Sequence, residues 1–243
     1  MIGALAAALL SSTSASAYTV EGSVEHVERM PSMSADLKAG AEFNQSTVKV
    51  DPGNKWVKLP AWFAGTWLVK QETAVYQKDF RTGKVIDQHK TYQARQEFGY
   101  GHQVDRQGNV WHYVGVPYTS KSRLMEYDEY HKVSSKEFQA ANDNEVRFRS
   151  VMDVIRVNPS TDTIVTSFQQ ESITSYRPVG EGVIELTSST KSFNRAGLPQ
   201  HETCNTATIK RSKPFKPVAE KDGKDLVALF HAFLTSQGLT NLI

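Results

Sequence analysis

Two histidines flank a predicted tight turn, and their imidazoles could act together. The turn spans residues 106–108 (Arg-Gln-Gly), and if Asp105 pairs with Asn109, then His102 lies opposite His112 on the same face. Cross-strand neighbours have Cβ atoms about 5 Å apart, which would let both rings bind one metal ion or respond together to acidification. A structural zinc site usually needs about four ligands. Because the local sequence supplies only two, two half-exposed histidines without a metal are the simpler interpretation.

Other catalytic groups lack the motifs that would make them reactive. The sequence contains no Gly-x-Ser-x-Gly elbow, no His-Glu-x-x-His, no phosphate-binding glycine loop and no dinucleotide fingerprint. Its single cysteine, Cys204, cannot form an internal disulfide and is expected in the core. A prediction of isomerase or cyclase activity would rest on fold analogy alone. We therefore predict a protein that is not an enzyme and has no certain cofactor.

A tyrosine-rich stretch with basic neighbours runs from Tyr118 to Lys132. Tyrosine combines an apolar ring with a hydrogen-bonding hydroxyl, which suits the rim of a ligand site or a protein interface. Ordinary cross-strand aromatic pairs are the alternative.

Composition narrows the class of protein. The 243 residues are 39% hydrophobic and 22% charged, as in a globular protein, and 28 Lys and Arg against 26 Asp and Glu leave a formal charge of +2. This balance lacks the basic excess that nucleic-acid binding requires. We expect one domain and no nucleic-acid partner.

The first residues predict a compartment. Residues 1–17 are an uncharged apolar run followed by small residues that end in Ala15-Ser16-Ala17, which favours a signal segment cleaved after Ala17. A packed N-terminal helix is the alternative. The mature protein is then expected outside the cytoplasm: secreted, periplasmic or in a thylakoid lumen. Residues 18–59 show no sustained period and predict an irregular arm.

Residues 60–213 predict an all-β domain. Runs rich in Val, Ile, Thr, Tyr and Phe alternate with turn residues, which indicates an antiparallel up-and-down barrel of about eight strands. Alternation places Phe148, Phe168 and Tyr176 inside, together with Gln170 and rows of Ser and Thr. A polar interior indicates a cavity for water or ligand, unless a bulge reverses the faces in mid-strand. The candidate ligand-binding residues are Tyr127, Phe148, Phe168, Gln170 and Tyr176.

Residues 214–243 predict a linker followed by an amphipathic helix from Asp225 to Gln237. Its apolar stripe is expected to pack on the barrel wall, with docking to a partner protein as the alternative. The residues of this stripe are Leu226, Leu229, Phe230, Phe233 and Leu234.

The string Trp62-Phe63-Ala64-Gly65-Thr66-Trp67 leads into the first predicted long strand. Its Gly-x-Trp core resembles the opening motif of lipocalins and the wider calycin group. That resemblance implies that Trp67 closes one end of a barrel and that Arg211, near the end of the last strand, packs across its ring. A tryptophan in an ordinary core is the alternative. The longer string is also similar to an uncharacterised family of cyanobacteria and the chloroplast lumen.

Two functions follow from these resemblances and patterns. The first is binding of a small apolar or amphipathic molecule, such as a pigment, lipid or tetrapyrrole, inside the barrel. The second is an accessory subunit of a larger membrane complex, with the arm and the C-terminal helix as docking elements. The lumenal resemblance makes a photosynthetic complex the natural host for such a subunit.

Overall fold

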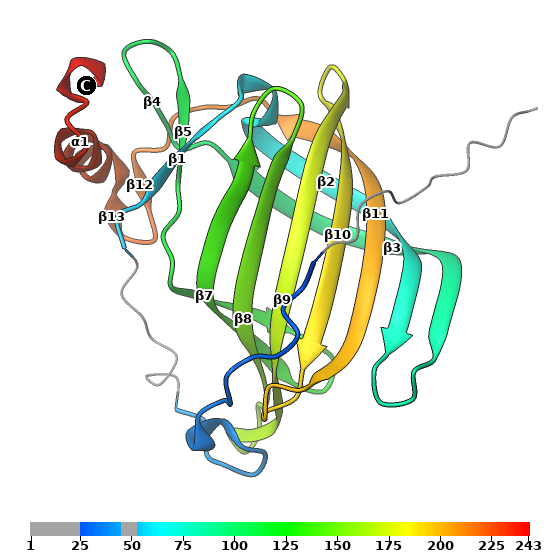
Figure 1. Cartoon of the computed structure of the whole chain (residues 1–243). Coiled ribbons are helices and arrows are strands. Elements are labelled where there is room, and N and C mark those ends of the chain that lie inside the picture. The colour runs from blue at the N-terminus through cyan, green and yellow to red at the C-terminus, as the bar shows by residue number, and fades with distance from the viewer. Residues whose placement is uncertain (1–24, 45–52) are drawn as a thin grey trace, which may run out of the picture.

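The computed structural model describes residues 25–44 and 53–243, apart from the side chains of residues 87 and 88 (Figure 1). Its main element is an eight-stranded antiparallel sheet. In spatial order its strands are β3 (Val85–Tyr100), β2 (Gly65–Asp79), β11 (Pro199–Lys213), β10 (Val183–Phe193), β9 (Thr163–Gly180), β8 (Val146–Asn158), β7 (Asp128–Ala141) and β6 (Tyr118–Arg123).

Smaller elements lie around this sheet. A three-stranded sheet is formed by β1 (Trp56–Leu59), β5 (Val110–Tyr113) and β4 (Gln103–Val104). The pair β12 (Glu220–Lys221) and β13 (Lys224–Asp225) precedes the helix α1 (Leu226–Ser236). Short 3-10 helices in the described residues are η1 (Ala35–Leu37), η3 (Ala61–Phe63) and η4 (Thr240–Leu242).

The prediction of an all-β, antiparallel fold is confirmed, but the predicted closure into a barrel is wrong. In the described part of the chain, the outermost strands β3 and β6 pair only with β2 and β7. The sheet still curves back on itself, because β2 and β3 cross behind β8–β10 in Figure 1 and the rings of Tyr100 on β3 and Phe148 on β8 lie 6.1 Å apart. We call the side that carries these two rings the inner face, and the opposite side the outer face.

The main sheet stays open because the chain leaves it after β3 and does not continue into a neighbouring strand. Gly101 has a φ of +86°, which glycine adopts without steric cost, and a Cβ there would lie 2.8 Å from a methyl of Val110. The hairpin β4–β5 that follows pairs with β1 in the separate sheet, and the chain returns to the main sheet only at β6, on its far edge. Counting turns along the sequence does not distinguish this hairpin from two more strands of a meander.

The inner face is packed at one end only. At that end lies a buried core that we call the aromatic end: Leu59, Phe63, Trp67, Val69, Tyr100, Val146, Phe148, Tyr176, Ile184, Leu186, Ala207 and Ile209. Farther along the same face, Gln170, Ser172, Ser188 and Thr190 are only half-buried. The register of β9 with β10 is continuous from Ile184 to Phe193. The polar rows therefore stay on the face of Tyr176, without a slip in mid-strand.

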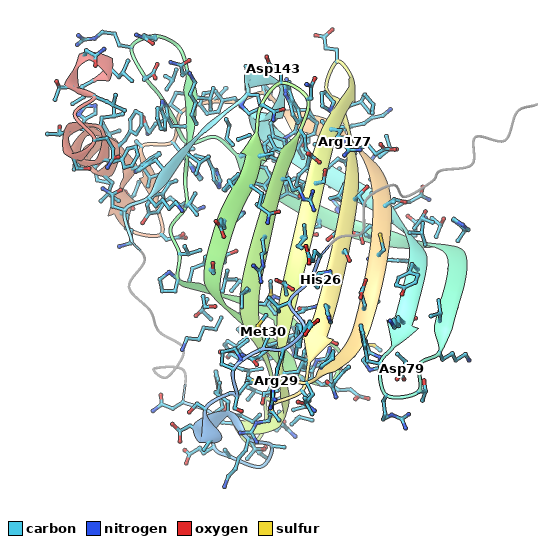
Figure 2. The ribbon with its side chains drawn as sticks, viewed as in Figure 1. His26, Arg29, Met30, Asp79, Asp143 and Arg177 are labelled. Carbon is cyan, nitrogen blue, oxygen red and sulfur yellow. The ribbon has the colours of Figure 1, made fainter. Side chains whose placement is uncertain are left out.

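Residues 25–44 run across the outer face, where Figure 2 shows His26, Arg29 and Met30 in front of the sheet. The amide of Met30 donates to the carbonyl of Gly197 (3.0 Å), in the turn between β10 and β11. Farther on, Leu37 and Phe43 pack with Ile155, Val157, Ile164 and Tyr130 in a second core. The described part of the predicted arm is thus bound to its own sheet.

The predicted C-terminal helix is present as α1, but it packs elsewhere than expected. Its buried residues Leu226, Phe230 and Leu234 contact Trp56 and Tyr113 of the three-stranded sheet rather than a barrel wall. Asp225 caps its N-terminus by accepting a hydrogen bond from the amide of Ala228 (2.9 Å). Among the described helices, none has the length and apolar character of a membrane span.

Candidate functional site

Gly65, Trp67 and Arg211 meet at the aromatic end, where β2 begins. Trp67 is fully buried and its ring centroid lies 5.0 Å from the Arg211 guanidinium carbon. Arg211 also donates to the carbonyl of Trp62. Gly65 has a φ of +127°, and a Cβ there would lie 2.8 Å from the carbonyl oxygen of Lys213. The contact of Arg211 with the ring of Trp67 is the one that the resemblance implies. The implied closure of a barrel by Trp67 is not found, because the sheet is open.

A small pocket lies beside this packing, lined in part by Trp62, Glu181, Gly182 and Arg211. Its volume of about 210 Å³ is below the roughly 300 Å³ at which small-molecule sites begin. It is too small for the ligand class predicted from the sequence.

Lys136 lies on the inner face, over the rings of the aromatic end. Its Nζ is 4.2 Å from the ring centroid of Phe148, 5.1 Å from that of Tyr100 and 5.8 Å from that of Phe138. Burial, with a smaller contribution from the nearby charge of Lys221, lowers the pKa of Lys136 to about 8. A lysine in this setting can pair with an anion or bind an apolar surface through its stem.

His102 and His112 lie opposite each other, as the predicted hairpin requires. Both are buried, and their rings stack with centroids 4.5 Å apart and planes 21° apart. The amide of Tyr113 donates to Nδ1 of His102 (2.9 Å), and the amide of Gly101 donates to Nδ1 of His112 (3.3 Å). In the neutral form His112 therefore carries its proton on Nε2. Nε2 of His102 lies 3.5 Å from Nζ of Lys221.

This geometry does not suit a shared metal ion. The nitrogen lone pairs lie in the ring planes, so stacked rings point them in parallel rather than toward one ion. Burial, aided by the charges of Lys221 and Lys136, lowers the pKa of His102 to about 3, and burial also lowers the pKa of His112. In the described part of the chain, no group of three or more His, Cys, Asp or Glu side chains could hold a metal.

The structure separates the predicted ligand-binding residues into two groups on one face. Phe148 and Tyr176 lie at the aromatic end, with ring centroids 6.0 Å apart. Phe168 and Tyr127 lie toward the other end, where the Arg156 guanidinium is 5.4 Å and 5.0 Å from their ring centroids. Gln170, half-buried, lies between these groups opposite Met152.

The predicted interface residues of the C-terminal helix pack against other parts of the chain. Leu226, Phe230 and Leu234 are buried in the core between α1 and the three-stranded sheet, while Leu229 and Phe233 are partly buried against it. These side chains are therefore not free to dock a partner in this arrangement.

Sequence reasoning missed a buried polar network under residues 25–44. Glu171, on the outer face of β9, is fully buried. Its Oε2 lies 2.9 Å from Nδ1 of His26 and accepts a hydrogen bond from the amide of Val27 (2.8 Å), while its other oxygen meets Arg149. Lys191 donates to the carbonyl of Val27 (2.9 Å). No local signal predicts this network, because its partners lie far apart in the sequence.

The same network contains a serine, a histidine and a carboxylate in the order of a catalytic triad. Nε2 of His26 lies 2.8 Å from Oγ of Ser189, and its Nδ1 faces Glu171. Ser189 is only 3% exposed, and the segment that covers it is the one that carries His26. If the segment lifted to admit a substrate, His26 would leave with it and Ser189 would lose its base. In this arrangement the three side chains anchor the segment to the sheet.

Comparison with protein-family models, curated proteins and solved structures found no match in any of the three.

Proposed function

We propose that this protein is a non-catalytic, extracytoplasmic binding protein that holds a small apolar or amphipathic molecule, of the pigment, lipid or tetrapyrrole class, against the inner face. The observation that carries the proposal is the uneven packing of this face. Phe148 and Tyr176 are buried at one end, while Ser172, Ser188 and Thr190 farther along are half-exposed. A curved sheet that leaves these hydroxyl groups accessible beside an aromatic core places hydrogen-bonding groups next to apolar ones, as ligand sites do.

The hydroxyl rows support this interpretation. Oγ1 of Thr174 lies 3.2 Å from Oγ of Ser188, and Oγ of Ser172 lies 3.2 Å from Oγ1 of Thr190. Each hydroxyl has one donor and two acceptor positions. Some of these positions therefore remain available for hydrogen bonds to polar groups of a ligand. The role of accessory subunit has less support, because the described part of the arm and the stripe of α1 both pack within the chain.

The test is native mass spectrometry together with visible absorption of the protein purified without detergent from its own source. We expect a monomer that begins at Tyr18 and carries the mass or colour of a small molecule. Co-migration in a large complex without ligand mass would contradict the proposal.

A pair of variants tests where the ligand lies. Ser188→Trp places a bulky ring on the accessible part of the inner face, so we expect it to abolish ligand binding while the unfolding temperature changes little. Val165→Trp, at an exposed position of β9, is the matched control and should bind normally. Full binding by Ser188→Trp would place the ligand elsewhere.

A further inference from the structure

A β-bulge places Lys136 on the inner face. Within β7 the register with β8 shifts between Val133 and Ser135, so that Val133 pairs with Met152 but Lys136 pairs with Ser150. Without the extra residue, alternation would direct Lys136 to the outer face. Bulges commonly re-aim a side chain next to a functional site.

The charge of Lys136 is not compensated by the described residues around it. The charged group acting on it is Lys221, another cation, and no described carboxylate forms an ion pair with it. The other titratable groups facing this region are His102 and His112 from the three-stranded sheet, both neutral, and the ring of Tyr100 from β3, near Tyr118 of β6. A half-buried cation without a counterion is costly, and a bound anion would relieve that cost.

The neighbours of Lys136 limit the kind of anion. Lys136 is the cation that lies over the rings of Tyr100, Phe138 and Phe148, whereas Lys221 acts on it through its charge alone. A single carboxylate can pair with Lys136 over these rings, but a dianionic phosphate would bring a second charge into a partly desolvated site. The rings favour an apolar body directly attached to the charged group. We infer that the inner-face site selects ligands with a single carboxylate, which pairs with Lys136 while the apolar remainder lies along the aromatic end. This inference rests on the proposed function.

The first test compares a fluorescent long-chain carboxylic acid with the alcohol of the same chain, at neutral pH. A charge-assisted contact predicts that the acid binds roughly tenfold tighter or more. Lys136→Met, which keeps the volume, should bind both equally, whereas Lys136→Arg should keep the preference. Lys84→Met, an exposed lysine, is the control and should behave as the unaltered protein.

A pH series of the same affinities separates a role of the Lys136 charge from a merely structural role of its side chain. Because the pKa of Lys136 is about 8, the preference for the acid should decline as the pH rises above about 8, while in Lys136→Arg it should persist. Equal affinity for acid and alcohol in the unaltered protein would overturn the carboxylate inference but leave the proposed function standing. Binding of acetate as tight as that of the long-chain acid would also overturn it. Failure of both long-chain probes to bind would count against the proposed function itself.

Discussion

At the scale of single residues, the outer face depends on a buried carboxylate. Glu171 is held between Arg149 and His26, and it also accepts the amide of Val27. Burial raises the pKa of Glu171, but these hydrogen bonds and charges outweigh it and leave the pKa below its usual 4.5. The ionised carboxylate therefore ties residues 25–44 to the sheet.

Glu171→Gln should weaken the attachment of these residues. The change removes the charge that pairs with Arg149 and replaces one acceptor oxygen by an NH₂ donor. At least one buried donor then loses its acceptor, which costs about 1–3 kcal/mol. We expect faster tryptic cleavage after the exposed Arg29 at neutral pH. Glu181→Gln, in the exposed turn before β10, is the matched control. An unchanged cleavage rate in Glu171→Gln would show that the carboxylate does not hold the segment.

The same carboxylate predicts an acid dependence. A folded-state pKa below the unfolded value gives stabilisation that is present above about pH 4.5 and is lost as the pH falls through the folded pKa. Hydrogen-exchange protection of residues 26–33, measured from about pH 6 to about pH 3, should fall in that window. In Glu171→Gln the protection should depend less on pH, and an equal dependence would contradict the assignment.

At the scale of elements, α1 and the three-stranded sheet form a second packing unit beside the main sheet. Trp56 lies between them, with its ring centroid 5.3 Å from that of Tyr113 and 4.8 Å from that of Phe230. The helical period predicts α1 from the sequence, because residues three and four apart share a face. What that face covers depends on where β1 and β5 lie in space.

Leu234→Ala tests whether α1 stabilises this unit. Leu234 is fully buried, so the change should lower the free energy of unfolding by about 2–5 kcal/mol, from lost burial and the cavity left behind. Val227→Ala, on the exposed side of the helix, should change it by less than about 1 kcal/mol. Chemical denaturation of both variants measures the difference, and equal losses would place the stripe of α1 outside the core.

At the scale of the whole molecule, stability should respond to the buried pair His102 and His112. The pKa of each is lowered in the folded state, chiefly by burial. Below an unfolded pKa of about 6.5 the unfolded chain binds protons that the folded chain does not, so acid favours unfolding. The loss of stability begins at that pH and continues as the pH falls toward the folded values.

Each histidine should lower the free energy of unfolding by up to about 1.4 kcal/mol for every pH unit below about pH 6.5. Replacing both by Asn keeps an acceptor near the position of Nδ1 but removes the titration. Urea unfolding between about pH 7 and about pH 5 should then show a smaller slope in the double variant. The same slope as in the unaltered protein would mean that other groups titrate in this range.

Local patterns predicted the faces of the central strands and one hairpin outside the main sheet. Alternation placed Phe148 and Tyr176 on one face with the hydroxyls of β9 and β10. The turn at Gly108 placed His102 opposite His112. The Gly-x-Trp resemblance implied the contact of Arg211 with Trp67 that the structure shows. The bulge that turns Lys136 inward had no such signal, because a register shift changes no local preference.

The sequence by itself determined the all-β class, the faces of the central strands and the C-terminal helix, because periods of two and 3.6 residues are properties of neighbouring positions. Only the tertiary structure decided that the sheet stays open, that residues 25–44 cover Glu171, and that Lys136 meets the aromatic end. His26 and Glu171 are separated by 145 positions. Contacts of that range depend on the path of the whole chain, which no local pattern encodes.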